Sequence, residues 1–309
     1  MLSDRYLEEL QDPAHPVSAS KLLNLSGLAA PEVEHLRSYW NAMSEERRLQ
    51  VIRQMGEVAE DNPEVDFQQV FRLGLHDPET EVRVQAIEGL WECQERWLIG
   101  ELVELMTKDP EIEVRSTAAS HMGKFALLGE LEEMRPRDIA TVRQALLDVI
   151  HNRDEELDVR RRAVEAISPF SDDAINDVIR EAYHSDALKM RASALYAMGV
   201  HCDPAWLPAV LTELKSDNPE MRFEAVRACG ELEDEHAVPA LIETVRDEDL
   251  QVREAAVEAL GRVGGRRAKQ ALKRMLTADD PTLQEAARAA LEELEISENP
   301  LTMPYQDER

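Results

Sequence analysis

The chain has 309 residues, of which 43% are hydrophobic, only 5% aromatic and 32% charged. Sixty-three acidic residues face thirty-five basic ones, so the formal net charge at pH 7 is −28. A chain this acidic repels a phosphate backbone at long range, so we expect no binding to nucleic acid. No apolar run approaches the ~20 residues that a membrane-spanning helix needs, so we expect no membrane span. The surplus charge favours solubility, and it also attracts a protein partner with a basic surface.

Residues 1–43 carry leucines at helical spacing and predict three short helices separated by Pro13, Pro16 and Pro31. We interpret this region as an N-terminal helical cap, because the repeats that follow it form a stack whose exposed end must be covered. The first residues hold no basic segment followed by an apolar one. We therefore expect no signal peptide and a cytoplasmic location.

A pattern of fixed phase returns along residues 44–296. It is an aliphatic residue followed by Arg, with Ala three positions after the Arg, a large apolar residue seven after it and often Gly eight after it. The clear copies place this Arg at positions 83, 115, 160, 191, 222 and 253. Most steps are 31 residues, and residues 44–60 fit as a degenerate first copy with Arg48 in phase. A fixed period near 30 is typical of stacked supersecondary units.

Each unit is predicted to be a pair of helices. Residues 237–245 are apolar at helical spacing, and Asp247 to Asp249 then offer an N-cap for a second helix. The second helix carries its apolar stripe from Val252 to Val263 and ends at Gly264. One such pair cannot bury its apolar face alone, so the pairs must stack. We predict an all-α fold, a right-handed α-solenoid of about seven helical hairpins.

Three places break the regularity. The step of 45 residues between Arg115 and Arg160 predicts an insertion near residues 125–138, which we expect to be a loop. Trp91 stands where other copies have Gly, and we expect both Trp91 and Trp97 to be core residues at an irregular junction and not a binding site. Residues 297–309 are polar with two prolines, and we expect a flexible C-terminal tail.

The pattern resembles the HEAT repeat, in the short form named after phycobilisome lyases. An Asp in the turn between the helices, then Val-Arg, Ala and Leu-Gly, carries the resemblance over residues 44–296. In that family the Asp and Arg of adjacent repeats form a buried ladder, and the second helix of each pair lines the concave face. The resemblance thus implies a structural ladder of Arg83, Arg115, Arg160, Arg191, Arg222 and Arg253. So many copies of Arg suit a repeated buried pair better than a repeated catalytic role.

Residues one, two and five positions after each Arg should point away from the core. In the later repeats they form a cluster of arginines and aromatics of the kind that protein interfaces favour. The candidate partner-binding residues are Arg161, Arg162, Tyr196, Phe223 and Arg227. Two alternatives are that Phe223 packs between helices while the arginines pair with the surplus acids, and that the 125–138 insertion is the binding element. Gln85 and Glu88 hold the equivalent positions of an earlier repeat.

The chain shows no set of residues typical of catalysis. Deoxyhypusine hydroxylase is a HEAT-like di-iron enzyme with His-Glu dipeptides repeated as ligands, and this chain contains no His-Glu dipeptide. We therefore expect no metal and no cofactor. Cys93, Cys202 and Cys229 lie far apart, and we expect reduced, buried thiols.

The sequence favours a non-enzymatic protein-binding adaptor or scaffold that acts through the concave face. One alternative is a HEAT-like enzyme of the deoxyhypusine hydroxylase or bilin lyase kind. A second alternative is a structural subunit of a larger complex. Because fold does not dictate function, the choice among these depends on the surface of the molecule.

Overall fold

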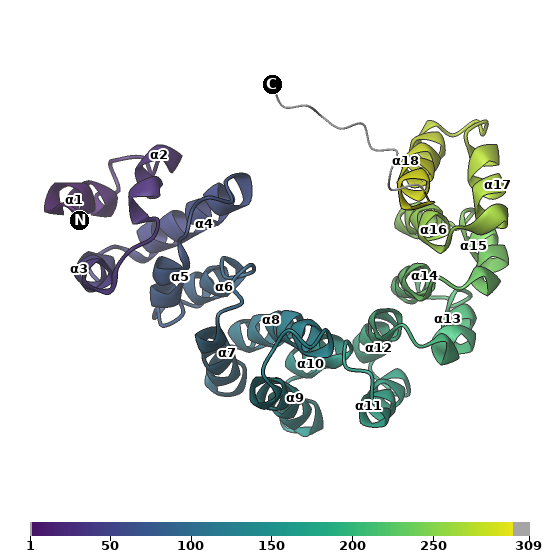
Figure 1. The fold of residues 1–309 in the computed structure, drawn as a ribbon, viewed down its shortest axis with the longest axis horizontal. Helices are drawn as coiled ribbons and strands as arrows, with labels where there is room; N and C mark the ends of the chain where they lie inside the picture. The colour runs from purple at the N-terminus through teal and green to yellow at the C-terminus, as the bar shows by residue number, and fades with distance from the viewer. Residues whose placement is uncertain (1, 299–309) are drawn as a thin grey trace. The chain divides into compact units, whose positions relative to one another are not determined.

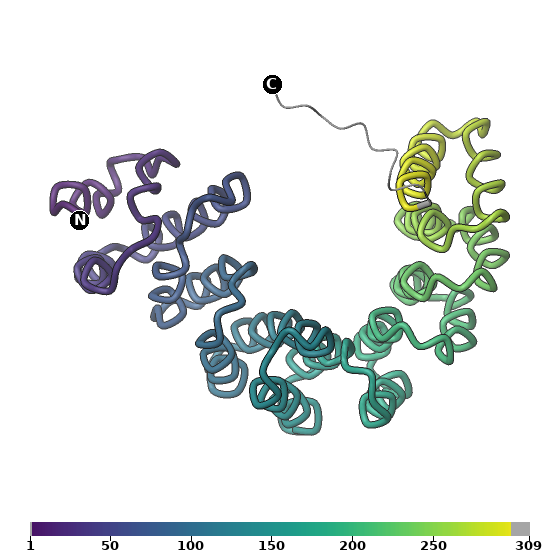
Figure 2. The backbone as a smooth tube through the Cα atoms, viewed as in Figure 1, coloured from purple at the N-terminus to yellow at the C-terminus, as the bar shows by residue number. Residues whose placement is uncertain are grey.

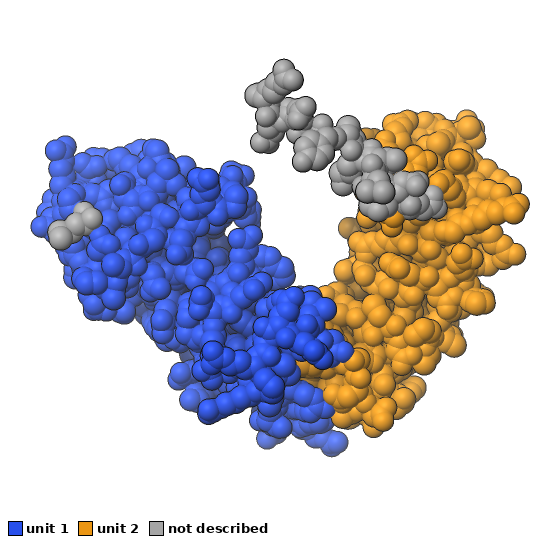
Figure 3. Space-filling view, in the orientation of Figure 1, with its two compact units in different colours: residues 1–166 blue, residues 167–309 orange. Residues whose placement is uncertain are grey.

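The structure is a computed structural model that describes residues 2–298. Within these residues the chain forms helices and turns and no strand, so the all-α prediction is confirmed (Figure 1). The apolar residues recur at three- and four-residue spacing, which lets each helix bury one stripe against its neighbours. The described chain divides into two compact units after Ala166, and each is described by itself (Figure 3).

The first unit begins with the N-terminal region and continues through one long helix and three helical pairs. Its helices are α1 (Asp4–Gln11), α2 (Ala19–Leu22), α3 (Ala30–Trp40), α4 (Glu45–Asp61), α5 (Gln68–Gly74), α6 (Thr80–Glu88), α7 (Arg96–Lys108), α8 (Ile112–Glu130), α9 (Pro136–His151) and α10 (Leu157–Ile167), with a 3-10 turn η1 (Leu23–Leu25).

The second unit repeats the pair with greater regularity. Its helices are α11 (Asp173–Tyr183), α12 (Leu188–His201), α13 (Leu207–Glu213), α14 (Pro219–Leu232), α15 (Val238–Thr244), α16 (Leu250–Val263), α17 (Gly265–Met275) and α18 (Pro281–Glu298), with 3-10 turns η2 (Pro204–Trp206) and η3 (Glu235–Ala237).

Each unit has two layers of helices. In the first unit α4 packs on α6 and α6 packs on α8, so the second helices of successive pairs lie side by side (Figure 2). In the second unit α12, α14, α16 and α18 form the same kind of row, and α11, α13, α15 and α17 each pack against their partner in that row. We call these the second-helix layer and the first-helix layer. This layered stacking of hairpins is the α-solenoid that the repeat period predicted.

Local chemistry explains why each pair forms where it does, and α16 is a clear case. The Asp249 side chain accepts hydrogen bonds from the backbone N–H groups of Gln251 and Val252, which caps the first turn. Val252, Ala256 and Leu260 are all buried along one stripe. Gly264 then ends the helix at a φ of 64°, which glycine adopts without strain.

The N-terminal region packs against the first helices of the repeats. Leu7, Leu22 and Leu36 are fully buried, and the Arg47 side chain of α4 donates to the Leu10 carbonyl oxygen at 2.6 Å. Pro31 does not separate two helices as expected. It stands inside the first turn of α3, where a missing N–H costs nothing.

The insertion predicted as a loop at 125–138 is mostly helix, and that prediction was wrong. The second helix α8 runs for 19 residues to Glu130, and α9 already begins at Pro136. Phe125 is fully buried. The additional residues therefore lengthen two helices, because their apolar side chains find core partners, and only residues 131–135 lie between them.

The predicted tail overlaps the described residues only at its start. Ser297 belongs to α18, and residues 299–309 lie outside the described part of the chain. Across residues 2–298, none of the helices is both long and apolar enough to span a membrane. Cys93 and Cys229 are buried as expected, but Cys202 is exposed because it occupies the left-handed C-cap of α12 at a φ of 53°.

Candidate functional site

The arginines of the repeat motif connect neighbouring repeats. Arg83 and Arg222 each form a two-pronged pair with the Asp of the next repeat, to Asp109 at 2.8 and 2.9 Å and to Asp247 at 2.7 Å twice. Each also donates from Nη1 to the carbonyl oxygen six residues before it, at 2.9 Å. The same Asp oxygens accept a backbone N–H two residues later, which shapes the turn. One arginine thus stabilises its own turn and the next repeat.

The other members of the predicted ladder behave differently. Arg115 reaches Glu155 at 2.9 Å, a glutamate in the place of the turn Asp. Arg160 donates to the Ile150 carbonyl oxygen at 3.2 Å, and the next acid in its series belongs to the other unit. Among residues 2–298, Arg191 has no ion pair, and Arg253 reaches only the Asp247 carbonyl oxygen, at 3.5 Å.

The ladder begins with an arginine–aspartate pair that the sequence analysis did not predict. Arg48 of α4 donates to Asp77 at 2.8 Å, and Trp40 donates to the same carboxylate oxygen at 2.7 Å. The Asp77 side chain is fully buried, so these two donors hold a charge that water cannot reach. The signal was present, since Asp77 opens the Asp series and Arg48 is in phase.

The five residues predicted to dock a partner are divided between the two units. Arg227 lies over the ring of Tyr196 at 5.4 Å and over the ring of Phe223 at 5.9 Å, so these three meet on the second-helix layer of the second unit. A small hollow of about 100 Å³ beside Phe223 and Arg227 adjoins them. Arg161 and Arg162 belong to the first unit and pair with acids of their own helix, at 2.6 Å to Asp158 and 2.7 Å to Glu165.

Glycines at the eighth position after the motif Arg bring neighbouring helices of the second-helix layer into close contact. A Cβ on Gly199 would lie 3.0 Å from the Cα of Ala228, and one on Gly230 would lie 3.3 Å from the Cα of Ala259. Gly123 meets Ala166 in the same way, at 3.3 Å. Each partner stands six residues after the Arg, or its equivalent, in the next repeat. Only glycine allows two helices to approach this closely.

Two successive positions of the first unit lack this close contact between neighbouring helices. The Gly56 position would pair with Gly89, yet nothing lies within 4 Å of a Cβ on Gly56. The reason is that α6 has only nine residues and ends at Glu88, whereas α12, α14 and α16 have 14. The next pair is Trp91 with His121, whose ring centroids stand 5.9 Å apart. The layer therefore stays open beyond the end of α6.

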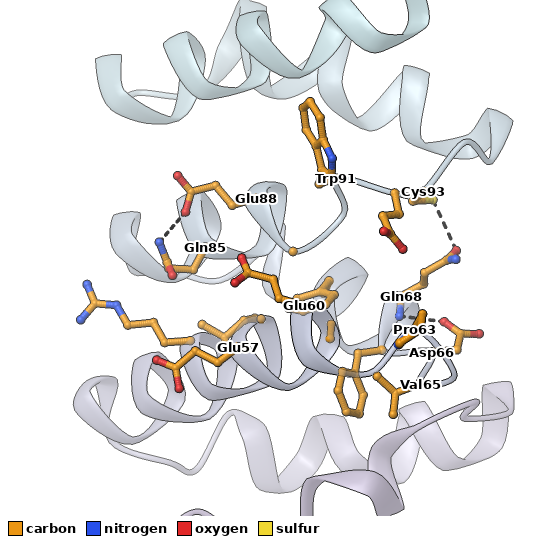
Figure 4. A pocket seen from close by; sticks show the side chains of 18 of the residues that line it. Glu57, Glu60, Pro63, Val65, Asp66, Gln68, Gln85, Glu88, Trp91 and Cys93 are labelled. Atoms are coloured by element: carbon orange, nitrogen blue, oxygen red, sulfur yellow. Dashed lines mark hydrogen bonds between the residues drawn. The ribbon is translucent and has the colours of Figure 1, made fainter. Parts of the chain in front are cut away.

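The opening is a groove of about 670 Å³ between the C-terminal ends of α4 and α6. Figure 4 shows Glu57 and Glu60 on α4 and Glu88 on α6, with Trp91 on the segment that follows α6. We call it the acidic groove. Its lining residues are Ile52, Arg53, Gly56, Glu57, Ala59, Glu60, Pro63, Glu64, Val65, Asp66, Phe67, Gln68, Phe71, Gln85, Glu88, Gly89, Trp91, Glu92 and Cys93.

The groove carries a large surplus of negative charge. Its one basic lining residue, Arg53, is already paired with Glu81 at 2.9 Å. Of its six acidic residues, four have side chains without a hydrogen bond or ion pair anywhere in residues 2–298, namely Glu57, Glu60, Glu64 and Glu92. Partial burial raises the pKa of Glu88, and the neighbouring Glu113 adds to that shift. A positive charge placed in this groove would relieve the repulsion.

Trp91 is the aromatic side of the same groove. We expected it in the core, and that expectation was wrong, because 64% of its surface is exposed. Lys124 of α8 fixes the segment that carries it, donating to the carbonyl oxygens of Leu90 at 2.7 Å and Trp91 at 2.9 Å. Burial lowers the pKa of Lys124 to about 8. The exposed indole is held in place by its backbone.

The His121 ring packs edge-to-face with the Trp91 ring and is neutral at pH 7. Burial lowers its pKa to about 4, and its Nε2 atom finds no hydrogen-bond partner in the described chain. Its Nδ1 atom lies 3.2 Å from the Thr117 carbonyl oxygen. Residues 2–298 hold no group of three or more His, Cys, Asp and Glu side chains placed to bind a metal ion.

Stacked helical hairpins, two layers and a ladder of arginine–carboxylate pairs define the class of the molecule as an α-solenoid. A family model described as HEAT repeats matches residues 207–292. This part of the second unit therefore consists of HEAT repeats. No curated protein matches it in sequence.

Solved structures resemble the chain over most of its length. The complex of CpcE and CpcF of phycocyanin lyase from a Nostoc species is 17% identical, covers 77% of this chain and 91% of its own, and has a TM-score of 0.51. The Kap95:Nup1 complex is 14% identical, covers 94% of this chain and 46% of its own, and also scores 0.51. At these identities the likeness shows the fold alone. Human deoxyhypusine hydroxylase, at 18% identity over 94% of this chain and 95% of its own, has a TM-score of 0.37, too low to support a functional comparison.

Proposed function

We propose that this protein is a non-enzymatic adaptor that binds a basic segment of a partner protein in the acidic groove. The observation that carries the proposal is the exposed Trp91 beside four carboxylates without partners in the described chain. Such a surface costs free energy through charge repulsion, and a cationic ligand removes that cost. The groove lies in the second-helix layer, whose counterpart in related repeats lines the concave face.

The groove fits a Lys or Arg side chain chemically. A guanidinium over the Trp91 indole gains about 0.5–1 kcal/mol at an exposed site. Glu57 and Glu60 of α4 then offer charge-assisted hydrogen bonds to its N–H groups. A volume of about 670 Å³ exceeds one side chain, so the neighbouring residues of the segment also find room.

The whole chain supports the same partner chemistry. Its net charge of −28 attracts a basic protein and speeds the first encounter, whereas it repels nucleic acid. The attraction is screened by salt, so binding should weaken steeply as ionic strength rises.

The proposal of a non-enzymatic role rests on the missing His-Glu dipeptides of the sequence. Elemental analysis of protein purified without an affinity tag should find far less than one iron per chain. Two irons per chain, lost when His121 is changed, would establish a di-iron enzyme and reject the adaptor.

A second docking place for the same function is the set of Tyr196, Phe223 and Arg227. The observation in its favour is the paired stacking of Arg227 on both rings beside a small hollow. Arg227 is already engaged by its neighbours, including Glu224 at 3.6 Å, which leaves it less to offer a partner than the groove carboxylates.

Capture of the partner from an extract of the native host separates these sites. The groove variant combines Trp91→Ala, Glu57→Gln and Glu60→Gln, and the cluster variant combines Tyr196→Ala, Phe223→Ala and Arg227→Ala. We expect the groove variant to lose the captured protein and the cluster variant to keep it, with unchanged helical circular dichroism in both. The reverse result would move the site to the second unit. A third variant, with residues 131–135 replaced by Gly and Ser, tests the insertion without disturbing the buried Phe125.

A further inference from the structure

The helix α17 has the opposite charge to the chain around it. Its eleven residues, Gly265–Met275, contain five basic side chains and no acidic one, on a chain with a net charge of −28. The basic residues are Arg266, Arg267, Lys269, Lys273 and Arg274. A run of one sign on an opposite background marks a surface at which charge selects the ligand.

A groove with an apolar lining runs along this helix. It measures about 470 Å³ and lies among α15, α17 and the first turn of α18, all in the second unit. Its apolar lining includes Ile242, Val245, Ala271, Met275 and Leu283. Ile242 is 37% exposed, although a large aliphatic side chain would gain by burial. We call it the basic groove.

Three arginines border the basic groove and have no acid to pair with. They are Arg246, two residues after the end of α15, and Arg267 and Arg274 of α17. All three side chains are exposed, and none makes a hydrogen bond or ion pair with any residue from 2 to 298. Elsewhere in the second unit Arg180, Arg222, Arg227 and Arg262 all pair with carboxylates. Within residues 2–298, Arg191, Arg253, Arg266 and Arg288 of the second unit also lack a paired carboxylate, so this groove differs in that three unpaired guanidiniums border one apolar lining.

We propose that the basic groove binds an acidic amphipathic helix of a partner protein. The apolar lining would receive the aliphatic or aromatic stripe of that helix, and the three guanidiniums would bind carboxylates beside the stripe. Arg267 and Arg274 stand seven residues apart on one face of α17, which places them about 10 Å apart along its axis. Carboxylates seven residues apart on the bound helix match that spacing.

The chemistry of the groove favours this occupant over a polyanion. A nucleic acid carries charge all along its backbone, so the remaining acidic surface of the chain repels most of it. It also brings no aliphatic side chains for Ile242, Val245 and Leu283. A short acidic helix satisfies both halves of the groove, and its charge is screened from the distant carboxylates within about 8 Å at physiological salt.

The proposal does not depend on the acidic groove, because the two sites lie in different units and select opposite charges. Selection of a display library of random peptides, each about 16 residues or ~24 Å long as a helix, against the full chain provides the probe. We expect the enriched peptides to carry Asp or Glu seven residues apart beside an apolar stripe. The best peptide is then synthesised, and its Kd is measured by fluorescence anisotropy.

Two variants with equal loss of charge on the same helix give the decisive comparison. Arg267→Gln with Arg274→Gln should weaken the peptide about tenfold or more. Arg266→Gln with Lys273→Gln removes the same charge outside the groove and should change the Kd less than about twofold. Binding should also survive in the acidic-groove variant, so failure of one proposal is distinguishable from failure of the other.

Three results would overturn the basic groove as an acidic-helix site. One is a set of enriched peptides without acidic residues. Another is an equal loss of affinity in both α17 variants, which would show attraction by the whole helix. The third is displacement of the peptide by a single-stranded DNA oligonucleotide that binds more tightly, or by a second copy of the chain seen as a dimer in sedimentation.

Discussion

The row α12, α14 and α16 and the row α4, α6 and α8 are built from the same repeat, yet one is closed and the other is open. In the first row Gly199 and Gly230 lie against Ala228 and Ala259 of the next helix. In the second row Gly56 faces open space, and Trp91 and His121 stand where a glycine and an alanine would meet. The comparison teaches that a solenoid acquires a groove where one helix ends early and the small residues at its contact are replaced.

The largest effect should come from breaking the ladder that both rows share. Arg222→Ala leaves the Asp247 carboxylate with its side chain only 10% exposed and without its cation. We expect a loss of ~3 kcal/mol in the free energy of unfolding, measured by urea denaturation. Arg253→Ala is the matched control, because Arg253 donates only to a carbonyl oxygen, at 3.5 Å, and acts on the Asp247 carboxylate without a hydrogen bond to it. Equal losses in the two variants would mean that the Arg222–Asp247 pair contributes nothing of its own.

The closed and open contacts can be compared directly with one substitution at two equivalent positions. Gly199→Leu forces a side chain against the Ala228 backbone and should cost roughly 2 kcal/mol. A Cβ at Gly56 meets nothing within 4 Å, so Gly56→Leu should be neutral or stabilising by about 0.5–1 kcal/mol, because leucine favours helix over glycine. The thermal midpoints of the two variants should therefore move in opposite directions. A drop in both would show that the open row is closed in solution.

These comparisons also separate what the sequence could predict from what it could not. The period and the phase of Val252-Arg253 and its copies predicted the hairpins, because apolar spacing dictates which face of a helix is buried. Phase does not say where a helix ends. That is why the end of α6 at Glu88 and the extension of α8 to Glu130 were missed.

The candidate site was visible only in part. Gln85 and Glu88 were placed on the outward face, and both line the acidic groove. Trp91 was recognised as a departure from Gly. An aromatic residue in an apolar context is predicted to be a core residue, unless the neighbouring helix is known to end before it. The contribution of residues 63–68 could not be predicted, because a turn lacks the periodicity that would orient its side chains.

The pair of Trp91 and His121 predicts a pH dependence that the closed row lacks, since alanine holds the equivalent position there. The pKa of His121 is about 4 in the folded chain and about 6.5 when unfolded, so the unfolded state binds more protons between these values. Stability contributed by neutral His121 is complete above pH 6.5 and is lost as the pH falls toward 4.

Lowering the pH from 7 to 5 should therefore cost roughly 2 kcal/mol of unfolding free energy through this group. His121→Gln removes the titration, so the variant should lose less stability than the parent chain over the same interval. Parallel pH profiles for the two proteins would show that His121 is already protonated or solvated in the fold.

The central claim is that the acidic groove, and not the overall charge, binds a cationic segment. Its most direct test is the Kd of a short arginine-rich peptide at low salt for two variants of equal charge. Glu57→Gln, Glu60→Gln and Glu92→Gln change the groove, whereas Glu220→Gln, Glu285→Gln and Glu292→Gln change exposed positions in the other unit. The account predicts about a tenfold weaker Kd for the groove variant and less than about a twofold change for the control. Equal Kd values for the two variants would contradict it.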